Sequence, residues 1–146
     1  IGAPVKGEVI DIKETKDMVF NTESLGKGVG IIPKSNKIIA PIGGVITTFF
    51  PTKHAVGITT DEGIEVLIHI GIDTVELNGK FFTDKKKQGD RINRGEELLN
   101  VEFEEIMKSG YDTTVLMVIV NTANYKEIKT ILGNKEQGEI VIEIEA

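Results

Sequence analysis

Short apolar runs separated by glycine-containing turns repeat along the chain. The runs are rich in valine, isoleucine and threonine, and the 16 glycines are spread over the whole sequence. Runs of this kind, bounded by turn residues, are typical of short β-strands joined by tight connections. The pattern predicts strands over residues 38–40, 44–50, 55–60, 64–70, 115–121 and 139–144.

Helical patterns are few. Residues 103–108 predict a short helix that Gly110 ends, and residues 124–132 predict another with Gly133 as its C-cap. Because strand patterns dominate, we expect an all-β fold, an antiparallel β-sandwich with one or two short helices.

Two pairs of segments repeat one another. Residues 3–9 match residues 40–45, each with a proline near its start and a glycine three residues after that proline. Residues 89–98 match the looser segment 133–141. A glycine in this place suits a kink or bulge before a strand. The repeats indicate a sandwich built from duplicated hairpin units.

The composition fits one globular domain over residues 1–146. Apolar residues make up 40% of the chain and charged residues 27%, which is enough to bury a core. The net charge of −6 argues against nucleic acid or an anionic membrane as the main partner. No apolar run approaches the roughly 18–20 residues that cross a bilayer, and the N-terminus lacks a signal-peptide pattern, so no membrane insertion is expected.

The chain has no cysteine. This excludes thiol nucleophiles, cysteine-based zinc sites and disulfide frameworks. It also suits a reducing compartment, so we expect a cytoplasmic protein. The sequence begins at Ile1 rather than at a methionine, and either a trimmed chain or one domain of a longer polypeptide would begin this way.

The chain has two histidines, His54 at the start of one predicted strand and His69 near the end of the next. Between these strands lies Asp61-Glu62-Gly63, a hairpin turn signal. With a two-residue turn, the two histidines lie opposite each other, with Cβ atoms roughly 4.5–5.5 Å apart. A three-residue turn shifts the register by one residue and is expected to put the two imidazoles on opposite faces.

Facing imidazoles suit the transfer of a phosphoryl group. A neutral imidazole, with an unperturbed pKa of about 6.5, is a nucleophile near neutral pH, and a second imidazole can donate an N–H to the anion that the first one captures. Positioning and charge stabilisation supply most of the catalysis in phosphoryl transfer. Two alternatives are a purely structural pair and a two-histidine metal site, which lacks a third ligand at close spacing.

Four segments together resemble a known family. The run from Val66 to Gly79, VLIHIGIDTVELNG, closely resembles the phosphorylation-site segment of the glucose-family enzyme IIA domains of the bacterial phosphoenolpyruvate-dependent sugar phosphotransferase system. Residues 51–55 are similar to the second-histidine segment of that family, and residues 40–44 and 89–92 fall where other family motifs do. The resemblance extends over residues 3–144 and implies the sandwich called the duplicated hybrid motif.

The resemblance implies a phosphocarrier, a phosphotransferase with a phosphohistidine intermediate. His69 would accept a phosphoryl group on Nε2 from the phosphohistidine of the carrier protein HPr and pass it to a cysteine of a IIB sugar-transporter domain. His54 matches the histidine whose N–H stabilises the phosphoryl oxygens, and Thr52 matches the residue that orients this imidazole. Gly71 matches the residue whose carbonyl accepts the Nδ1–H of the acceptor histidine.

The resemblance also implies a docking surface. Asp73 lies four residues after His69, where it would pair with an arginine of HPr, although it also suits a turn residue. Four side chains match an apolar collar around the histidines, although each alone also suits a core position: Val19, Phe20, Phe50 and Val75. Phe20 precedes a polar run and is expected to be the most exposed of them.

Other expectations complete the hypothesis. We expect a monomer without a resident cofactor or metal; whether adventitious or regulatory zinc binds at His54 and His69 stays open. The sugar, glucose or a related one, and the presence of fused transporter domains also stay open. Rival functions are a biotinyl or lipoyl carrier with Lys108 as the attachment site, a zinc peptidase, for which two histidines are too few, and a purely binding module.

Overall fold

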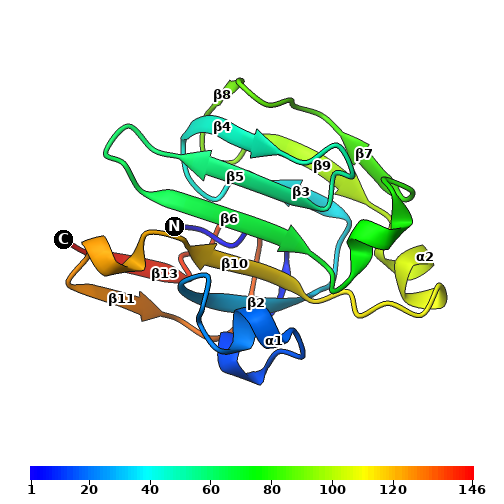
Figure 1. The fold of residues 1–146 in the computed structure, drawn as a ribbon, viewed down its shortest axis with the longest axis horizontal. Coiled ribbons are helices and arrows are strands. Elements are labelled where there is room, and N and C mark those ends of the chain that lie inside the picture. Colours follow the sequence, from blue (N-terminus) through cyan, green and yellow to red (C-terminus); the bar gives the residue numbers. More distant parts are fainter.

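Antiparallel strands make up most of the protein (Figure 1). The structure is a computed structural model that describes all residues, 1–146. The two α-helices are short, at four and six residues. Neither is long and apolar enough to cross a lipid bilayer.

Thirteen strands follow one another along the chain. Their bounds are β1 Gly7–Asp11, β2 Lys27–Pro33, β3 Lys37–Ile39, β4 Gly44–Phe49, β5 Ala55–Thr59, β6 Glu65–Ile70, β7 Phe82–Asp84, β8 Arg91–Ile92, β9 Glu97–Val101, β10 Val115–Ile119, β11 Glu127–Thr130, β12 Gly133–Lys135 and β13 Ile142–Glu145. The helices are α1 Met18–Asn21 and α2 Phe103–Lys108, with 3-10 turns η1 Ile12–Glu14, η2 Thr74–Leu77 and η3 Thr122–Asn124.

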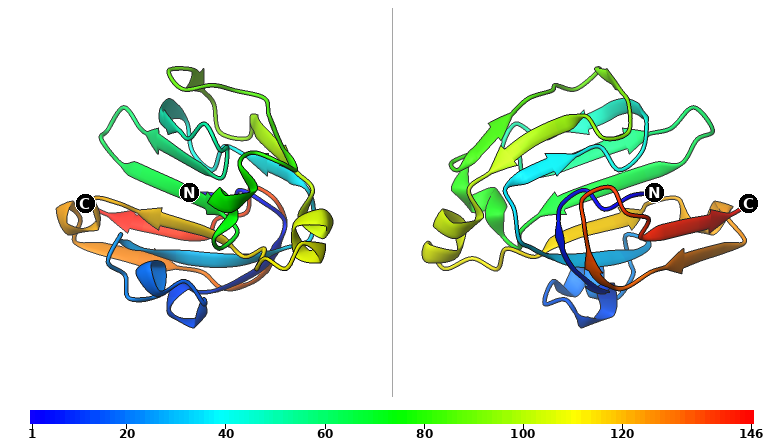
Figure 2. Two further views of the ribbon diagram at one scale, coloured as in Figure 1. Left: turned by 45° about the vertical axis from the view of Figure 1, so that its right-hand side comes forward. Right: turned by 180° about the vertical axis from the view of Figure 1, so that it is seen from behind.

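The strands form three sheets. The largest has eight strands in the order β12-β1-β2-β10-β6-β5-β4-β8, the second has the order β3-β9-β7, and the third pairs β11 with β13. Seen from behind, in the right-hand view of Figure 2, the three-stranded sheet lies in front of the eight-stranded one. The predicted all-β sandwich with short helices is confirmed.

The two larger sheets enclose one cluster of 25 buried residues. Ile68 and Ile70 of β6 point into this core, and Leu99 of β9 meets them from the facing sheet. Because side chains alternate along a strand, Leu67 and His69 of β6 point to the opposite, outer face of the large sheet. The hydrophobic pattern thereby places a histidine on the outside.

Residues 12–21 cover the part of this outer face that lies over β2 and β10. Ile12 and Phe20 pack there on Leu116 and Val118 of β10, in a second small cluster. Leu116 lies directly opposite His69 in the sheet. The covering segment, at the bottom of Figure 1, is thus held beside the outward-facing histidine.

Equivalent hydrogen bonds occur in the two halves of the chain, as the sequence repeats suggest. The N–H of Ala3 donates to the carbonyl of Glu139, and the N–H of Ala40 donates to that of Glu96, both at 2.8 Å. In each half the glycine before the glutamate donates back to the same alanine at 2.9 Å. The two hairpin units therefore make the same contacts, in agreement with duplication.

Five of the six predicted strands match β3, β4, β5, β6 and β10 to within two residues at either end. The sixth was predicted to begin at residue 139, but β13 begins at Ile142. Glu139 instead closes a turn, its N–H donating to the carbonyl of Glu136. The hydrophobic pattern also does not reveal β2, because two glycines interrupt its apolar run.

The predicted helix over residues 124–132 is wrong. The segment begins with the end of η3 and continues as β11, in which Ile128 lies opposite Ile144 of β13. Half-buried and exposed residues alternate along β11, as they do in a strand with one covered face. Pairing with β13 therefore outweighs the weak helical propensity, and Gly133 begins β12 rather than capping a helix.

The register of the β5–β6 hairpin differs by one residue from the register that a two-residue turn would give. His69 lies opposite Ala55, not opposite His54. The connection holds three residues, 61–63, because Gly63 adopts a φ of 93°. A glycine with positive φ at the end of a three-residue loop is a common hairpin geometry. By alternation alone, this register would separate the two imidazoles.

The close approach of β2 to β10 yields a stability prediction. A Cβ atom at Gly28 would lie 1.9 Å from the carbonyl oxygen of Met117, which is backbone and cannot rotate away. We expect Gly28→Ala to lower the free energy of unfolding by about 1–3 kcal/mol, as overpacking does. Gly43→Ala is the matched control, because its nearest atom is 3.5 Å away, and it should change stability by less than about 0.5 kcal/mol. Urea unfolding measures both, and equal stabilities would contradict the prediction.

Candidate functional site

His69 lies at the end of β6, on the outer face of the large sheet, and its side chain is half-buried. Its Nδ1 lies 2.8 Å from the carbonyl oxygen of Gly71, two residues further on. Because a carbonyl oxygen only accepts, Nδ1 carries the proton. In the neutral ring, Nε2 then has a free lone pair.

His54 lies just before β5, where strand alternation does not yet apply. Lys53 has a φ of 62°, which turns the chain so that the His54 ring reaches the outer face. Its centroid lies 5.0 Å from that of His69, with an interplanar angle of 84°. The expectation that a three-residue turn separates the rings is therefore wrong, because it treated His54 as a strand residue.

Thr52 anchors the second imidazole. Its Oγ1 lies 2.6 Å from Nδ1 of His54, and the His54 side chain is almost completely buried, with 4% of the residue exposed. A hydroxyl group can donate to this nitrogen, which leaves the proton of the neutral ring on Nε2. The structure thus brings Thr52, His54, His69 and Gly71 together, as the sequence analysis expected.

Burial keeps both imidazoles neutral. Burial, the larger cause, and the neighbouring His69 together lower the pKa of His54 to about 4. Burial also lowers the pKa of His69, against the opposing effects of the Gly71 carbonyl and the carboxylates of Asp17 and Asp73. At neutral pH, the site therefore presents an uncharged nitrogen nucleophile beside a second uncharged imidazole.

Two aromatic rings flank the histidines. The Phe20 centroid lies 5.2 Å from that of His69, and the Phe50 centroid lies 5.2 Å from that of His54. Phe20 was expected to be the most exposed member of the collar, but it is only 4% exposed, because it packs on β10. Val19, at 52%, is among the exposed members instead.

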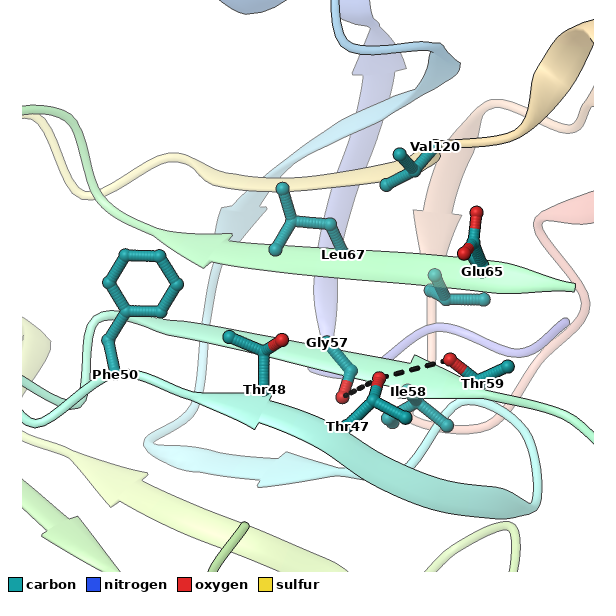
Figure 3. A pocket seen from close by; sticks show the side chains of 10 residues that line it. Thr47, Thr48, Phe50, Gly57, Ile58, Thr59, Glu65, Leu67 and Val120 are labelled. Atoms are coloured by element: carbon teal, nitrogen blue, oxygen red, sulfur yellow. Dashed lines mark hydrogen bonds between the residues drawn. The ribbon is translucent and has the colours of Figure 1, made fainter. Parts of the chain in front are cut away.

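Further apolar surface surrounds the pair. Val75 and Phe50 are exposed, as are Met18 and Val120, which the sequence analysis did not single out. A groove of about 330 Å³ runs from Phe50 along the outer face of the sheet, over Leu67 to Val120 (Figure 3). Three threonines line its other side: Thr47, Thr48 and Thr59. Most of these residues come from the consecutive strands β4, β5 and β6, and Val120 joins them from the end of β10.

Two acidic residues, Asp17 and Asp73, lie close enough to His69 to oppose the lowering of its pKa. Asp73 has a φ of 62° and makes no capping hydrogen bond with its side chain, although it precedes η2. Asp17 caps α1, accepting from the N–H of Val19 at 2.9 Å. Sequence reasoning missed Asp17, although an aspartate before a run of three apolar residues is a helix-start signal.

The chain offers few ligands to a metal ion. No group of three or more histidine, cysteine, aspartate or glutamate side chains is placed to hold one. Lys108, considered as a cofactor attachment site, lies at the end of α2 and contacts Glu104 and Glu105 at 3.6 and 3.7 Å. It is an exposed surface charge.

Comparisons with known proteins agree with this geometry. Residues 1–125 match the family described as phosphoenolpyruvate-dependent sugar phosphotransferase system, EIIA 1. The solved glucose permease IIA from Mycoplasma capricolum has a TM-score of 0.92 at 37% identity, covering 97% of this chain and 92% of that one.

The relatives include a protein of similar length to this chain and proteins that are much longer. A glucose-specific EIIA component from Buchnera aphidicola is 37% identical, with 97% of this chain and 88% of the relative covered. A β-glucoside-specific EIIBCA component from Bacillus subtilis is 45% identical over 86% of this chain, which spans only 20% of that relative's length. The chain belongs to the EIIA 1 family of the phosphoenolpyruvate-dependent sugar phosphotransferase system.

Proposed function

We propose that this chain is a phosphocarrier in which His69 takes a phosphoryl group from phosphorylated HPr and passes it to a cysteine of a IIB sugar-transporter domain. The observation that carries the proposal is the hydrogen bond from His69 Nδ1 to the Gly71 carbonyl, which leaves Nε2 free. Family membership supports the same reaction.

The transfer consists of two displacements. The lone pair of His69 Nε2 attacks phosphorus, a new N–P bond forms, and the N–P electron pair of the donor returns to the donor histidine. In the second step a cysteine thiolate of the IIB domain attacks the same phosphorus, and the breaking N–P bond returns its electrons to Nε2. Such transfers depend mainly on positioning and charge stabilisation.

His54 stabilises the transferred group. With the Thr52 hydroxyl donating to its Nδ1, His54 presents Nε2–H beside His69. This N–H donates to a phosphoryl oxygen, a bond to an anion that is stronger than a neutral one. Because the imidazole is neutral, it stabilises the anion without forming a tight ion pair that would slow the onward step.

The surrounding surface serves docking. The apolar side chains Val19, Phe50 and Val75 exclude water from the phosphohistidine, and together with the groove they bind the apolar face of a partner. Asp73 lies beside them and pairs with an arginine of HPr. One surface therefore serves the donor and the acceptor in turn, which requires that each complex be short-lived.

The remaining expectations follow from the same hypothesis. We infer that the protein works in the cytoplasm as a monomeric module without a cofactor, and that the sugar is glucose or a related glucoside, as the names of its relatives suggest. Zinc at His54 and His69 would find two nitrogen ligands here and would need others from a partner or water. No step of the transfer uses it.

Replacement of His69 tests the proposal directly. We expect His69→Ala to abolish phosphoryl uptake from phosphorylated HPr while the fold stays intact, because the other imidazole of the site, His54, has its Nδ1 occupied by the Thr52 hydroxyl and its proton on Nε2. Intact mass and mapping of the labelled residue measure the uptake. Asp61→Asn, at the far end of the same hairpin, is the control and should behave as the wild type. Uptake by the His69→Ala protein would point to another acceptor.

His54→Gln separates the roles of the second imidazole. Glutamine keeps an N–H donor, so uptake from HPr should continue at a rate within a few-fold of the wild type. Onward transfer to the IIB cysteine should slow by about tenfold or more if the basicity of the imidazole matters there. Rapid-quench measurement of both half-reactions decides this, and an onward rate equal to the wild type would leave His54 with hydrogen bonding alone.

The pH dependence follows from the lowered pKa values. NMR titration should place the midpoint of His54 near 4 and that of His69 below 6.5, because burial disfavours both charged rings. Unfolded histidines bind protons near pH 6.5, so the unfolded state gains protons first. The contribution of the two histidines to the free energy of unfolding is therefore fully present above this pH. It is lost as the pH falls from about 6.5 towards 4. Midpoints at 6.5 would contradict the burial argument.

A further inference from the structure

The turn after His69 contains a buried polar side chain that the proposed function does not use. Thr74, the first residue of η2, has no exposed surface although it carries a hydroxyl group. Its Oγ1 donates to the carbonyl oxygen of Ile70 at 2.5 Å. A buried hydroxyl in a short hydrogen bond to the last residue of β6 holds the turn to the end of the strand.

The other branch of Thr74 packs against Gly71. A Cβ atom at position 71 would lie 2.5 Å from Thr74 Cγ2 and 3.1 Å from the carbonyl oxygen of Asp112. Gly71 also has a φ of 76°, which side-chain-bearing residues rarely adopt. The methyl group of Thr74 therefore occupies the space that a side chain at 71 would take.

The peptide unit between Ile70 and Gly71 is held at both ends. Its carbonyl oxygen accepts from the Thr74 hydroxyl, and its N–H donates to the carbonyl of Thr114 at 3.0 Å. A peptide unit is planar, so two fixed ends determine its orientation. This orientation in turn sets the direction in which the chain leaves Gly71.

The next peptide unit carries the carbonyl that binds His69. Its N–H, on Ile72, donates to the carbonyl of Asp112 at 2.9 Å, and its oxygen, on Gly71, accepts from His69 Nδ1. Thr74 thus fixes the plane immediately before the one that contacts the imidazole. Without the Thr74 hydroxyl, the peptide unit between Ile70 and Gly71 would be held only at its N–H, by Thr114. The direction of the Gly71 carbonyl would then be less firmly set.

We propose that Thr74 is a positioning residue, whose hydroxyl group holds the Ile70 carbonyl, thereby aims the Gly71 carbonyl at His69 and so keeps the proton of the His69 imidazole on Nδ1. An imidazole without this acceptor can place its proton on either nitrogen. The inference rests on the proposed function for the use of this tautomer, but the tautomer itself can be measured without any phosphoryl transfer.

Thr74→Val removes the hydroxyl and keeps the shape of the side chain. We expect a measurable fraction of His69 to shift to the Nε2–H tautomer, and the rate of phosphoryl uptake to fall about three- to tenfold, the ratio to which one lost hydrogen bond converts. Imidazole ¹⁵N chemical shifts of the labelled protein above pH 7 report the tautomer.

Two variants control for a merely structural effect. Thr74→Ser restores the hydroxyl and should restore the wild-type tautomer. Thr60→Val removes another buried threonine hydroxyl, which accepts from Ile64 N–H at 3.0 Å at the far end of the same hairpin. It should lower the unfolding temperature without changing His69. If Thr74→Val does not fold, Thr74→Ser and Thr74→Ala, which differ only in the hydroxyl, give the same comparison.

The outcomes separate the two proposals. A wild-type tautomer in Thr74→Val, or an equal shift in Thr60→Val, would overturn the role of Thr74. A wild-type protein that takes up no phosphate while Thr74→Val still changes the tautomer would overturn the proposed function and leave the positioning role in place. A shifted tautomer with slowed uptake, both restored in Thr74→Ser, supports both.

Discussion

The site depends on one hydrogen bond, from Nδ1 of His69 to the carbonyl oxygen of Gly71. A carbonyl cannot donate, so this contact fixes the proton on one ring nitrogen and frees the other. The contact spans only two residues, but it requires Gly71 to have a positive φ, and the turn is held by hydrogen bonds to the segment before β10. A local bond therefore relies on neighbours distant in sequence.

Burial determines the protonation state of the imidazole that makes this hydrogen bond. The two imidazoles lie between Phe20 and Phe50, where a charged ring would lose its hydration, and their pKa values fall accordingly. An imidazole that stays neutral is a nucleophile, whereas a protonated one is not. The apolar surroundings thus decide the protonation state of the site.

The fold supplies this environment by using both faces of one sheet. One face of the eight-stranded sheet packs against the three-stranded sheet and forms the main core. The other face is left partly open, covered only by residues 12–21 near His69. The outer face of the sheet thus leaves His69 half-buried beside exposed apolar side chains.

The sequence by itself indicated the strand-rich fold, the repeat of hairpin units and the two histidines as candidate site residues. It could do so because alternation, turn residues and motif spacing are local properties. It did not determine the helix expected over 124–132, since pairing of β11 with β13 outweighs propensity. Nor did it place His54, whose ring meets that of His69 only because the chain turns at Lys53, before β5 begins. The groove and the role of Asp17 likewise arise where separate segments meet. Only the tertiary structure decides such contacts, because long-range packing sets them and no short stretch of sequence encodes it.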